Sequence, residues 1–340
     1  MEPPVFIVGT GRCGSTMMSS IVRLHPRLLS LSEFFSALAA RAFTMRRPDG
    51  EEFWRLLTTL SPVAALTLVN DPEMEEVLYE FGAGARFTPG NVPPILMTAL
   101  PHLTRDYEAL FDELAPVVRS QPRAPLGQHY RNMFEWLCQR FDRMRVVERS
   151  GSSLLAVPAL ARLFPEAKFV HLCRDGRDAA ISMRRHSYFK VHLHIARFIQ
   201  HLGLNPFQPP LLYGSSYFYP CAESLVGRFL PIRRWITKPR GLAKFGEHWS
   251  RTIVSGTKFL SALPDESVLT LRYEDILQKP REELKRFMDF LGPEYADEGW
   301  LNDVSQIPRP PKSDWRVLPE DEQQRLNAVC QPGLAALGYT

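Results

Sequence analysis

Five short apolar segments rich in β-branched residues recur along the chain, with little alternation between polar and apolar positions. They cover residues 5–8, 28–31, 145–147, 168–172 and 268–271. Runs of this length and character are typical of parallel strands whose two faces are both buried. We therefore expect these five segments to form one parallel β-sheet.

Helical patterns follow four of the five segments, at residues 16–24, 154–163, 178–185 and 281–291. A further helix is expected at residues 320–330, after a proline-rich loop. Strands that alternate with helices indicate an α/β fold, in which helices flank both faces of an open parallel sheet.

Two stretches interrupt this alternation, at residues 36–143 and 186–244. The first contains helix-like pieces broken by prolines, and the second is rich in aromatic residues and proline. We interpret both as helical insertions in a single domain that spans residues 1–340. Ligands of open α/β sheets bind beyond the carboxyl ends of the strands, so the insertions are expected to cover the active site. The aromatic residues within 204–219 would form a wall or lid of that site, or simply pack in the core.

Composition and charge exclude several classes of protein. The chain is 45% hydrophobic, enough for a large core. Its 41 basic and 37 acidic residues are spread evenly and give a net charge of +4, so nucleic-acid binding is not indicated. Five scattered cysteines form no disulfide framework, and we find neither a secretion signal nor an apolar stretch long enough to span a membrane. We expect a cytoplasmic protein.

The first predicted strand runs into a glycine-rich turn, Gly9-Thr10-Gly11-Arg12-Cys13-Gly14-Ser15-Thr16, and then into a helix. This is the arrangement of a P-loop, whose backbone N–H groups and helix amino end bind tetrahedral anions. Gly9 and Gly14 have the spacing of the nucleotide triphosphatase motif, but Ser15 stands where that motif requires lysine. The loop therefore predicts a phosphate-type anion site in which Arg12 supplies the positive charge.

A second anion-binding pair follows the fourth predicted strand. Arg174 stands at the end of that strand, and Ser182 lies eight residues later in the next helix, which we expect Asp178 to cap. Arginine can donate two parallel hydrogen bonds to one phosphate. Arg174 and Ser182 are therefore predicted to bind a phosphate together.

Taken together, the glycine-rich loop with Arg12 and the later Arg174 and Ser182 resemble the sulfotransferase family that uses 3′-phosphoadenosine 5′-phosphosulfate (PAPS). In that family the loop holds the 5′-phosphosulfate and the arginine–serine pair holds the 3′-phosphate. The resemblance implies PAPS as co-substrate, adenosine 3′,5′-bisphosphate as product and no required metal. It also implies these donor-binding residues: Arg12, Cys13, Gly14, Ser15, Thr16, Arg174, Ser182 and, from a segment at 312–316, Lys312.

A narrower resemblance concerns residues 93–104 and 147–151. They look like the sulfotransferase domains of bacterial olefin-forming polyketide pathways and their stand-alone relatives. Those domains act on a β-hydroxyacyl chain carried by acyl carrier protein. The resemblance implies a hydroxyl acceptor, either bound to such a carrier or belonging to another small metabolite.

Sulfonate transfer needs a base for the acceptor proton and positive charge near the transferring group. Arg12 would supply the charge, while Glu33 after the second strand and His248 in a later helix are the two candidate bases. Both correspond to bases in relatives, and both have structural alternatives. Arg185 and His186 could reach the sulfonate. His192, His194 and His201 lack other ligands at suitable spacing, so we predict no metal site there.

Two other functions remain possible at this point. A P-loop kinase acting on a small molecule would require ATP and magnesium, and the missing lysine weighs against it. A catalytically silent protein that retains the fold would bind the nucleotide without turnover.

Overall fold

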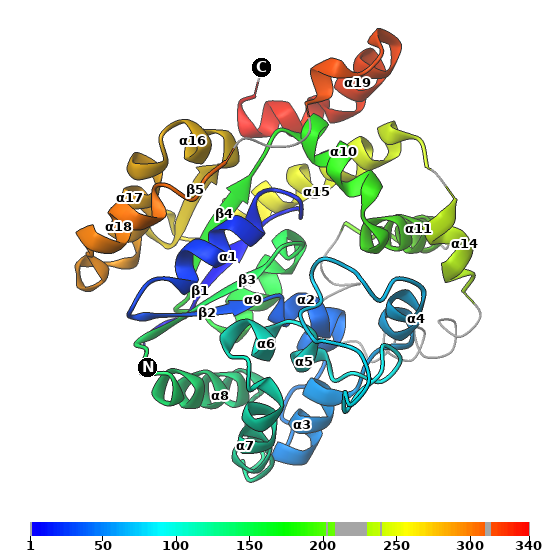
Figure 1. Ribbon diagram of the computed structural model, residues 1–340. Coiled ribbons are helices and arrows are strands. Elements are labelled where there is room, and N and C mark those ends of the chain that lie inside the picture. Colours follow the sequence, from blue (N-terminus) through cyan, green and yellow to red (C-terminus); the bar gives the residue numbers. More distant parts are fainter. Residues whose placement is uncertain (1, 202, 208–229, 239, 310–313, 340) are drawn as a thin grey trace.

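A fully parallel sheet of five strands forms the centre of the computed structural model, which describes residues 2–201, 203–207, 230–238, 240–309 and 314–339 (Figure 1). The strand order is β2-β3-β1-β4-β5, and Val5 of the central strand pairs with both Val147 and Lys168. The strands are β1 (Val5–Val8), β2 (Leu28–Ser32), β3 (Arg145–Ser150), β4 (Lys168–Cys173) and β5 (Val268–Arg272). The expected α/β fold is confirmed, and β2 to β5 each extend one to three residues beyond the predicted carboxyl end.

The sheet separates two hydrophobic cores, because successive side chains of a strand point to opposite faces. On one face, Val5 and Ile7 pack with Met18 and Ile21 of the first helix. On the other face, Phe6 and Val8 belong to a larger core. All four residues of β1 are buried, which explains why the strand reads as a continuous apolar run rather than an alternating one.

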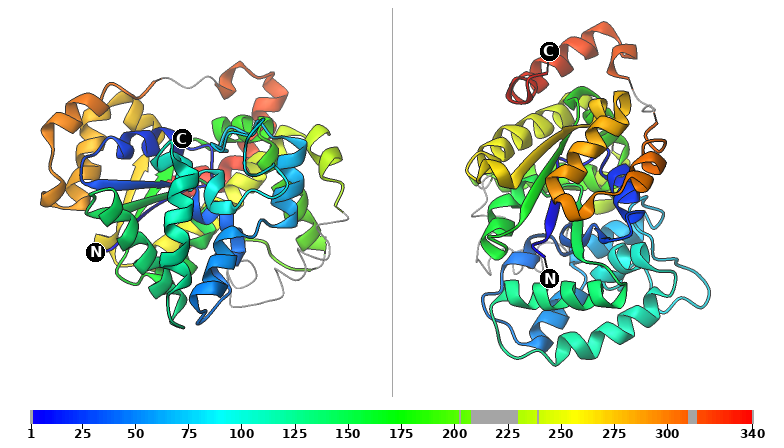
Figure 2. Two further views of the ribbon diagram at one scale, coloured as in Figure 1. Left: turned by 60° about the horizontal axis from the view of Figure 1, so that its bottom comes forward. Right: turned by 90° about the vertical axis from the view of Figure 1, so that its left-hand side faces the viewer.

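Helices of the α/β alternation cover both faces of the sheet (Figures 1 and 2). Each of the four helices expected after a strand is present, and the final helix is longer than predicted. These elements are α1 (Ser15–Arg23), η2 (Leu154–Ala156), α9 (Val157–Leu163), α10 (Gly176–Arg185), η3 (Asp265–Ser267), α16 (Tyr273–Gln278), α17 (Pro280–Leu291), η4 (Pro293–Tyr295), α18 (Glu298–Val304), η5 (Trp315–Val317) and α19 (Glu320–Leu337).

The first of the two stretches interpreted as insertions forms helices that lie below the sheet and, for α4, to its right in Figure 1. Its elements are α2 (Phe34–Leu38), η1 (Ala39–Phe43), α3 (Gly50–Thr58), α4 (Pro62–Asn70), α5 (Pro94–Met97), α6 (Ala99–Leu103), α7 (Tyr107–Arg119) and α8 (Leu126–Arg140). Local capping begins two of these helices: Asp49 and Glu52 form a capping box at α3, and the Ser61 hydroxyl accepts from the Ala64 N–H at α4.

The described part of the second stretch contributes α11 (Ser187–His201), α14 (Ile232–Thr237) and the start of α15 (Leu242–Leu260). Most of the aromatic segment at 204–219 lies outside the described residues, so its expected role as a wall or lid stays a prediction. Within the described ranges, no helix combines the length and apolar character needed to cross a membrane.

Candidate active site

The glycine-rich turn between β1 and α1 has the backbone geometry of an anion-binding loop. Gly11, Arg12 and Gly14 have φ values of 80°, 55° and 87°, and Gly14 is the N-cap of α1. Such a succession of left-handed residues turns backbone N–H groups toward the concave side of the loop. The start of α1 adds the positive end of a helix dipole to the same place.

Two glycines of this loop lie against aromatic rings that leave no room for a side chain. A Cβ atom on Gly14 would come within 2.3 Å of Cδ2 of Tyr273, and one on Gly11 within 2.3 Å of Cζ of Phe189. Tyr273 begins the helix after β5, and Phe189 belongs to α11. The loop is therefore shaped by contacts from two distant segments as well as by its own sequence.

The second predicted anchor lies beside the first, because β4 is the neighbour of β1 in the sheet. Arg174 is buried, its Nη1 donates to the Arg12 carbonyl at 3.2 Å, and its guanidinium lies 4.9 Å from the centre of the Tyr273 ring. Ser182, in α10, accepts a hydrogen bond from Arg12 Nε at 2.9 Å. Arg12, Arg174 and Ser182, predicted from separate motifs, thus form one cluster.

The helix that carries Ser182 begins differently from our expectation. Its N-cap is Asp175, whose carboxylate accepts from the Arg177 N–H at 2.9 Å and pairs with the Arg177 side chain. Asp178 instead accepts from the Trp315 N–H, and burial raises the pKa of its carboxyl to about 6. The prediction that Asp178 caps this helix is therefore wrong, since the N-cap lies three residues earlier, at Asp175.

A cavity of about 440 Å³ opens at the carboxyl edge of the sheet and joins these motifs to the helical insertions. Arg12, Gly14, Ser15, Thr16, Glu33, Arg174, Ser182 and His186 all line it. Much of the remaining lining is apolar and includes Phe35, Ala40, Phe43, Val63, Ala64, Leu68, Met97 and Ile195. One end of the cavity is thus suited to anions and the other to an apolar molecule.

Comparison of the sequence with models of protein families identifies the family of this chain. A model of the sulfotransferase family matches residues 3–207, and a model of the sulfotransferase domain matches residues 109–306. The chain belongs to the sulfotransferase family. Its first match covers the glycine-rich loop, Arg174 and Ser182, the residues on which the sequence resemblance depended.

Two curated relatives are sulfotransferases from mycobacteria. Both are named omega-hydroxy-beta-dihydromenaquinone-9 sulfotransferase Stf3, one from Mycobacterium bovis and one from Mycobacterium tuberculosis. Each is 24% identical over 294 residues, which cover 86% of this chain. The chain spans 63% of the length of these relatives.

Solved structures of sulfotransferase domains also align with this chain. The domain from the curacin biosynthetic pathway has a TM-score of 0.48 and 16% identity, and the alignment covers 100% of this chain and 99% of that domain. The domain of a Synechococcus olefin synthase has a TM-score of 0.45 and 16% identity, with 100% and 97% covered.

Glu33, one of the two candidate bases, lines the cavity but is held by strong partners. Its carboxylate forms an ion pair with Arg149 and accepts from the Gly151 N–H at 3.1 Å. Glu33 itself has a positive φ of 52° and is the N-cap residue of α2. The carboxylate is therefore fixed in place and already neutralised by a buried guanidinium.

His248, the other candidate base, lies behind the cavity wall. Its ring packs 5.3 Å from that of His192 and 5.5 Å from that of Phe207, and it does not line the cavity. Burial lowers the pKa of His248 to about 3. His192 does line the cavity, and burial lowers its pKa to about 4. His248 would reach a substrate through His192 rather than directly.

A cluster that the sequence did not reveal lies between Arg12 and the first insertion. Arg12 donates from Nη1 to Glu76 at 2.9 Å and from Nη2 to Glu75 at 3.2 Å, and Glu76 also pairs with Nε2 of His186. Burial raises the pKa of Glu76, but the hydrogen bond from His186 and the charge of Arg12 together bring it below its usual value. Glu75 and Glu76 lie in a segment without a recognisable motif, so only the folded chain brings them here.

The same cluster is the one place in the described part of the chain where three potential metal ligands converge. Ligand atoms of Glu75, Glu76 and His186 lie within 4.8 Å of one another. The Arg12 guanidinium already occupies this position between the two carboxylates, so the cluster resembles an ion-pair network more than a metal site.

The three histidines considered from the sequence have separate partners: His192 stacks on Tyr188, His194 on Trp235, and His201 bonds to the carbonyl of Arg197.

Three remaining predicted site residues lie at or beyond the edge of the cavity. Arg185 is exposed and lines a smaller hollow of about 380 Å³, which it shares with Arg12, Arg174 and Ser182. The Cys13 side chain points into the core, where burial raises the pKa of its thiol to about 11, so only its backbone faces the loop. Lys312 lies outside the described residues.

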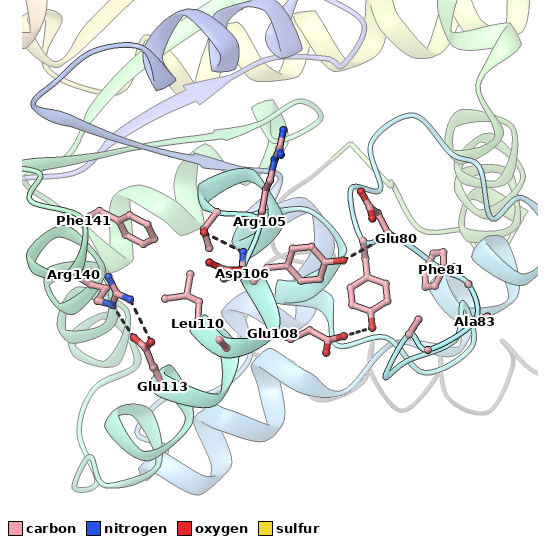
Figure 3. Close-up of a pocket in the computed structure, with 17 residues that line it drawn as sticks. Glu80, Phe81, Ala83, Arg105, Asp106, Glu108, Leu110, Glu113, Arg140 and Phe141 are labelled. Atoms are coloured by element: carbon pink, nitrogen blue, oxygen red, sulfur yellow. Dashed lines mark hydrogen bonds and ion pairs between the residues drawn. The ribbon is translucent and has the colours of Figure 1, made fainter.

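A larger hollow, of about 700 Å³, lies elsewhere, between the segment at 79–85 and α7 (Figure 3). Two pairs of its polar side chains are engaged with each other: Arg140 pairs with Glu113 at 2.8 Å, and the Tyr79 hydroxyl donates to Glu108 at 2.5 Å. None of the predicted site residues lines it. Size alone therefore does not identify the active site of this protein.

Proposed function

We propose that this chain transfers a sulfonate group from PAPS to a hydroxyl acceptor by in-line displacement. The observation that carries the proposal is the direct contact between Arg12 and Ser182, at 2.9 Å. The first belongs to the loop predicted to hold the phosphosulfate and the second to the pair predicted to hold the 3′-phosphate. A single bisphosphorylated nucleotide can contact both motifs only if they lie close together, as this contact indicates.

The donor site would work mainly by fixing and neutralising negative charge. The loop N–H groups and Arg12 would bind the phosphosulfate, and Arg174 with Ser182 would bind the 3′-phosphate. Donors placed where negative charge develops are each worth about 3 kcal/mol of activation free energy. A sulfonate carries less charge than a γ-phosphoryl group, so the proposal requires no metal ion.

For the acceptor, we propose a hydroxyl group on a largely apolar molecule. The cavity wall formed by α2, η1 and α4 is mainly apolar, and the mycobacterial relatives are named for an omega-hydroxy-dihydromenaquinone. A hydroxyacyl chain delivered by acyl carrier protein would also present an apolar body. The assignment of Glu33 or His248 as the base that removes the acceptor proton stays a prediction.

Titration calorimetry with adenosine 3′,5′-bisphosphate and with ATP tests the donor. We expect the bisphosphate to bind and Arg174→Ala to weaken it by about tenfold or more, since a hydrogen bond to a charged group contributes about 1.5–3 kcal/mol. Arg12→Ala is expected to lower kcat by about 100-fold. Tight binding of ATP without binding of the bisphosphate would contradict the proposal and favour a kinase.

Transfer itself is tested by incubation with ³⁵S-labelled PAPS and a panel of alkanols, phenols, quinols, sugars and carrier-bound hydroxyacyl chains. A labelled product is expected with acceptors that combine a hydroxyl and an apolar body. Binding of the bisphosphate with no labelled product in any case would instead favour a catalytically silent protein.

A further inference from the structure

His186 lines the cavity, and its two ring nitrogens lie in chemically different surroundings. Nε2 pairs with the Glu76 carboxylate, whereas Nδ1 is buried and has no hydrogen-bond partner among the described residues. A carboxylate accepts only, so Glu76 selects the tautomer that is protonated on Nε2. That tautomer leaves a lone pair on Nδ1.

The position of Glu76 is fixed by the first insertion rather than by the sheet. The Thr98 hydroxyl donates to the Glu76 carbonyl, and the Leu78 N–H donates to the Met97 carbonyl at 2.7 Å. Its carboxylate is then held from two sides, by Arg12 and by His186. The insertion thus places one carboxylate between the anion-binding arginine and a histidine.

The other groups considered for proton removal are less suited to it. Both oxygens of Glu33 face the Gly151 N–H, and one also pairs with Arg149. His248 does not line the cavity, and His192 stacks on Tyr188 with no carboxylate partner in the described part of the chain. His186 combines a place in the cavity wall with a carboxylate partner, the partly exposed Glu76.

We propose that His186 is the base that removes the acceptor proton and that Glu76 is its positioning residue. This rests on the proposed function. The hydroxyl proton moves to Nδ1 while the acceptor oxygen forms a bond to sulfur. The bond from sulfur to the 5′-phosphate oxygen breaks, and the bisphosphate leaves with that electron pair. Arg12 binds the donor, and the Glu76 carboxylate then has the imidazolium as its partner.

Two acceptors of different acidity test the role of His186. 4-Nitrophenol ionises near neutral pH and needs little help from a base, whereas 1-octanol does not ionise. His186→Gln, which keeps an amide donor for Glu76, is expected to lower kcat for 1-octanol about 100-fold or more, the usual contribution of a positioned base. Transfer to 4-nitrophenol is expected to change by less than about threefold, because the base is then dispensable.

Glu75 provides the matched control for Glu76. Both carboxylates touch Arg12, but only Glu76 touches His186. Glu76→Gln is expected to lower the ratio of the octanol rate to the nitrophenol rate by about tenfold, while Glu75→Gln keeps the wild-type ratio. Equal losses with both acceptors in His186→Gln, or no loss with either, would overturn the assignment.

Histidine side-chain ¹⁵N NMR of the full chain with bound adenosine 3′,5′-bisphosphate tests the tautomer of His186 even if neither 1-octanol nor 4-nitrophenol is a substrate. We expect His186 protonated on Nε2 and unprotonated on Nδ1, with the resonance assigned by its loss in His186→Gln. A proton on Nδ1 of neutral His186 would exclude it as the base. If the wild-type chain does not bind the bisphosphate at all, the proposed function fails first, which is a distinct outcome.

Discussion

At the scale of single residues, Glu148 is a buried acid next to the site. It lies within β3, fully buried, and its Oε1 accepts from the Phe35 N–H at 3.3 Å and from the Ser150 hydroxyl at 2.5 Å. Burial raises the pKa of Glu148 to about 8. The carboxyl is therefore protonated at neutral pH, and it connects the start of α2, which follows Glu33, to the central sheet.

This shift predicts a specific dependence of stability on pH. The folded chain holds the Glu148 proton more tightly than the unfolded chain, so this contribution is complete below the ordinary pKa of a glutamate. It is lost as pH rises toward about 8, by up to about 1.4 kcal/mol per pH unit. Urea unfolding of the wild type and of Glu148→Gln between pH 5 and 9 measures it. The glutamine keeps the accepting oxygen, so the variant is expected to lose less stability over this range, and identical profiles would refute the assignment.

At the scale of elements, the loop between β1 and α1 depends on glycine at position 14. Gly14→Ala would add a Cβ at 2.3 Å from the Tyr273 ring and would also disfavour the φ of 87°. We expect the variant to lose binding of adenosine 3′,5′-bisphosphate by more than about tenfold and to unfold at a lower temperature. Gly241→Ala is the control, since nothing lies within 4 Å of its added Cβ. If calorimetry showed that Gly14→Ala binds the bisphosphate as tightly as the wild type, this interpretation of the loop would be wrong.

The sequence predicted the strands better than it predicted the insertions, for a physical reason. A strand buried on both faces must be apolar at every position, and that leaves a local signal in the five segments. The helices of the first insertion instead acquire their positions from packing against one another, and no local pattern records which of them faces the sheet edge. The capping error at Asp178 has a similar origin, because Asp175 and Asp178 are equally good caps in isolation.

At the scale of the whole molecule, the site is assembled from parts that are distant in sequence. Arg12, Arg174 and Ser182 could be predicted, because each follows a strand and parallel strands end at one edge of a sheet. Glu76 and the close contact of Tyr273 with Gly14 could not, because they depend on how the insertion and α16 return to that edge. The turns after the strands therefore supply the residues predicted to bind the donor, and the helices α2, η1 and α4 of the first insertion supply much of the apolar lining.

That division predicts that the two ends can be changed independently. Ala64 of α4 lines the apolar end, whereas its neighbour Ala65 does not line the cavity. Ala64→Trp would fill the space with an indole ring, so transfer to 1-octanol is expected to fall by about tenfold or more while the dissociation constant of adenosine 3′,5′-bisphosphate stays within about twofold. Ala65→Trp is the matched control and is expected to leave both unchanged. If Ala64→Trp weakened the nucleotide as much as it slowed transfer, α4 would border the donor rather than the acceptor, because only a ligand in contact with the new ring can be excluded by it.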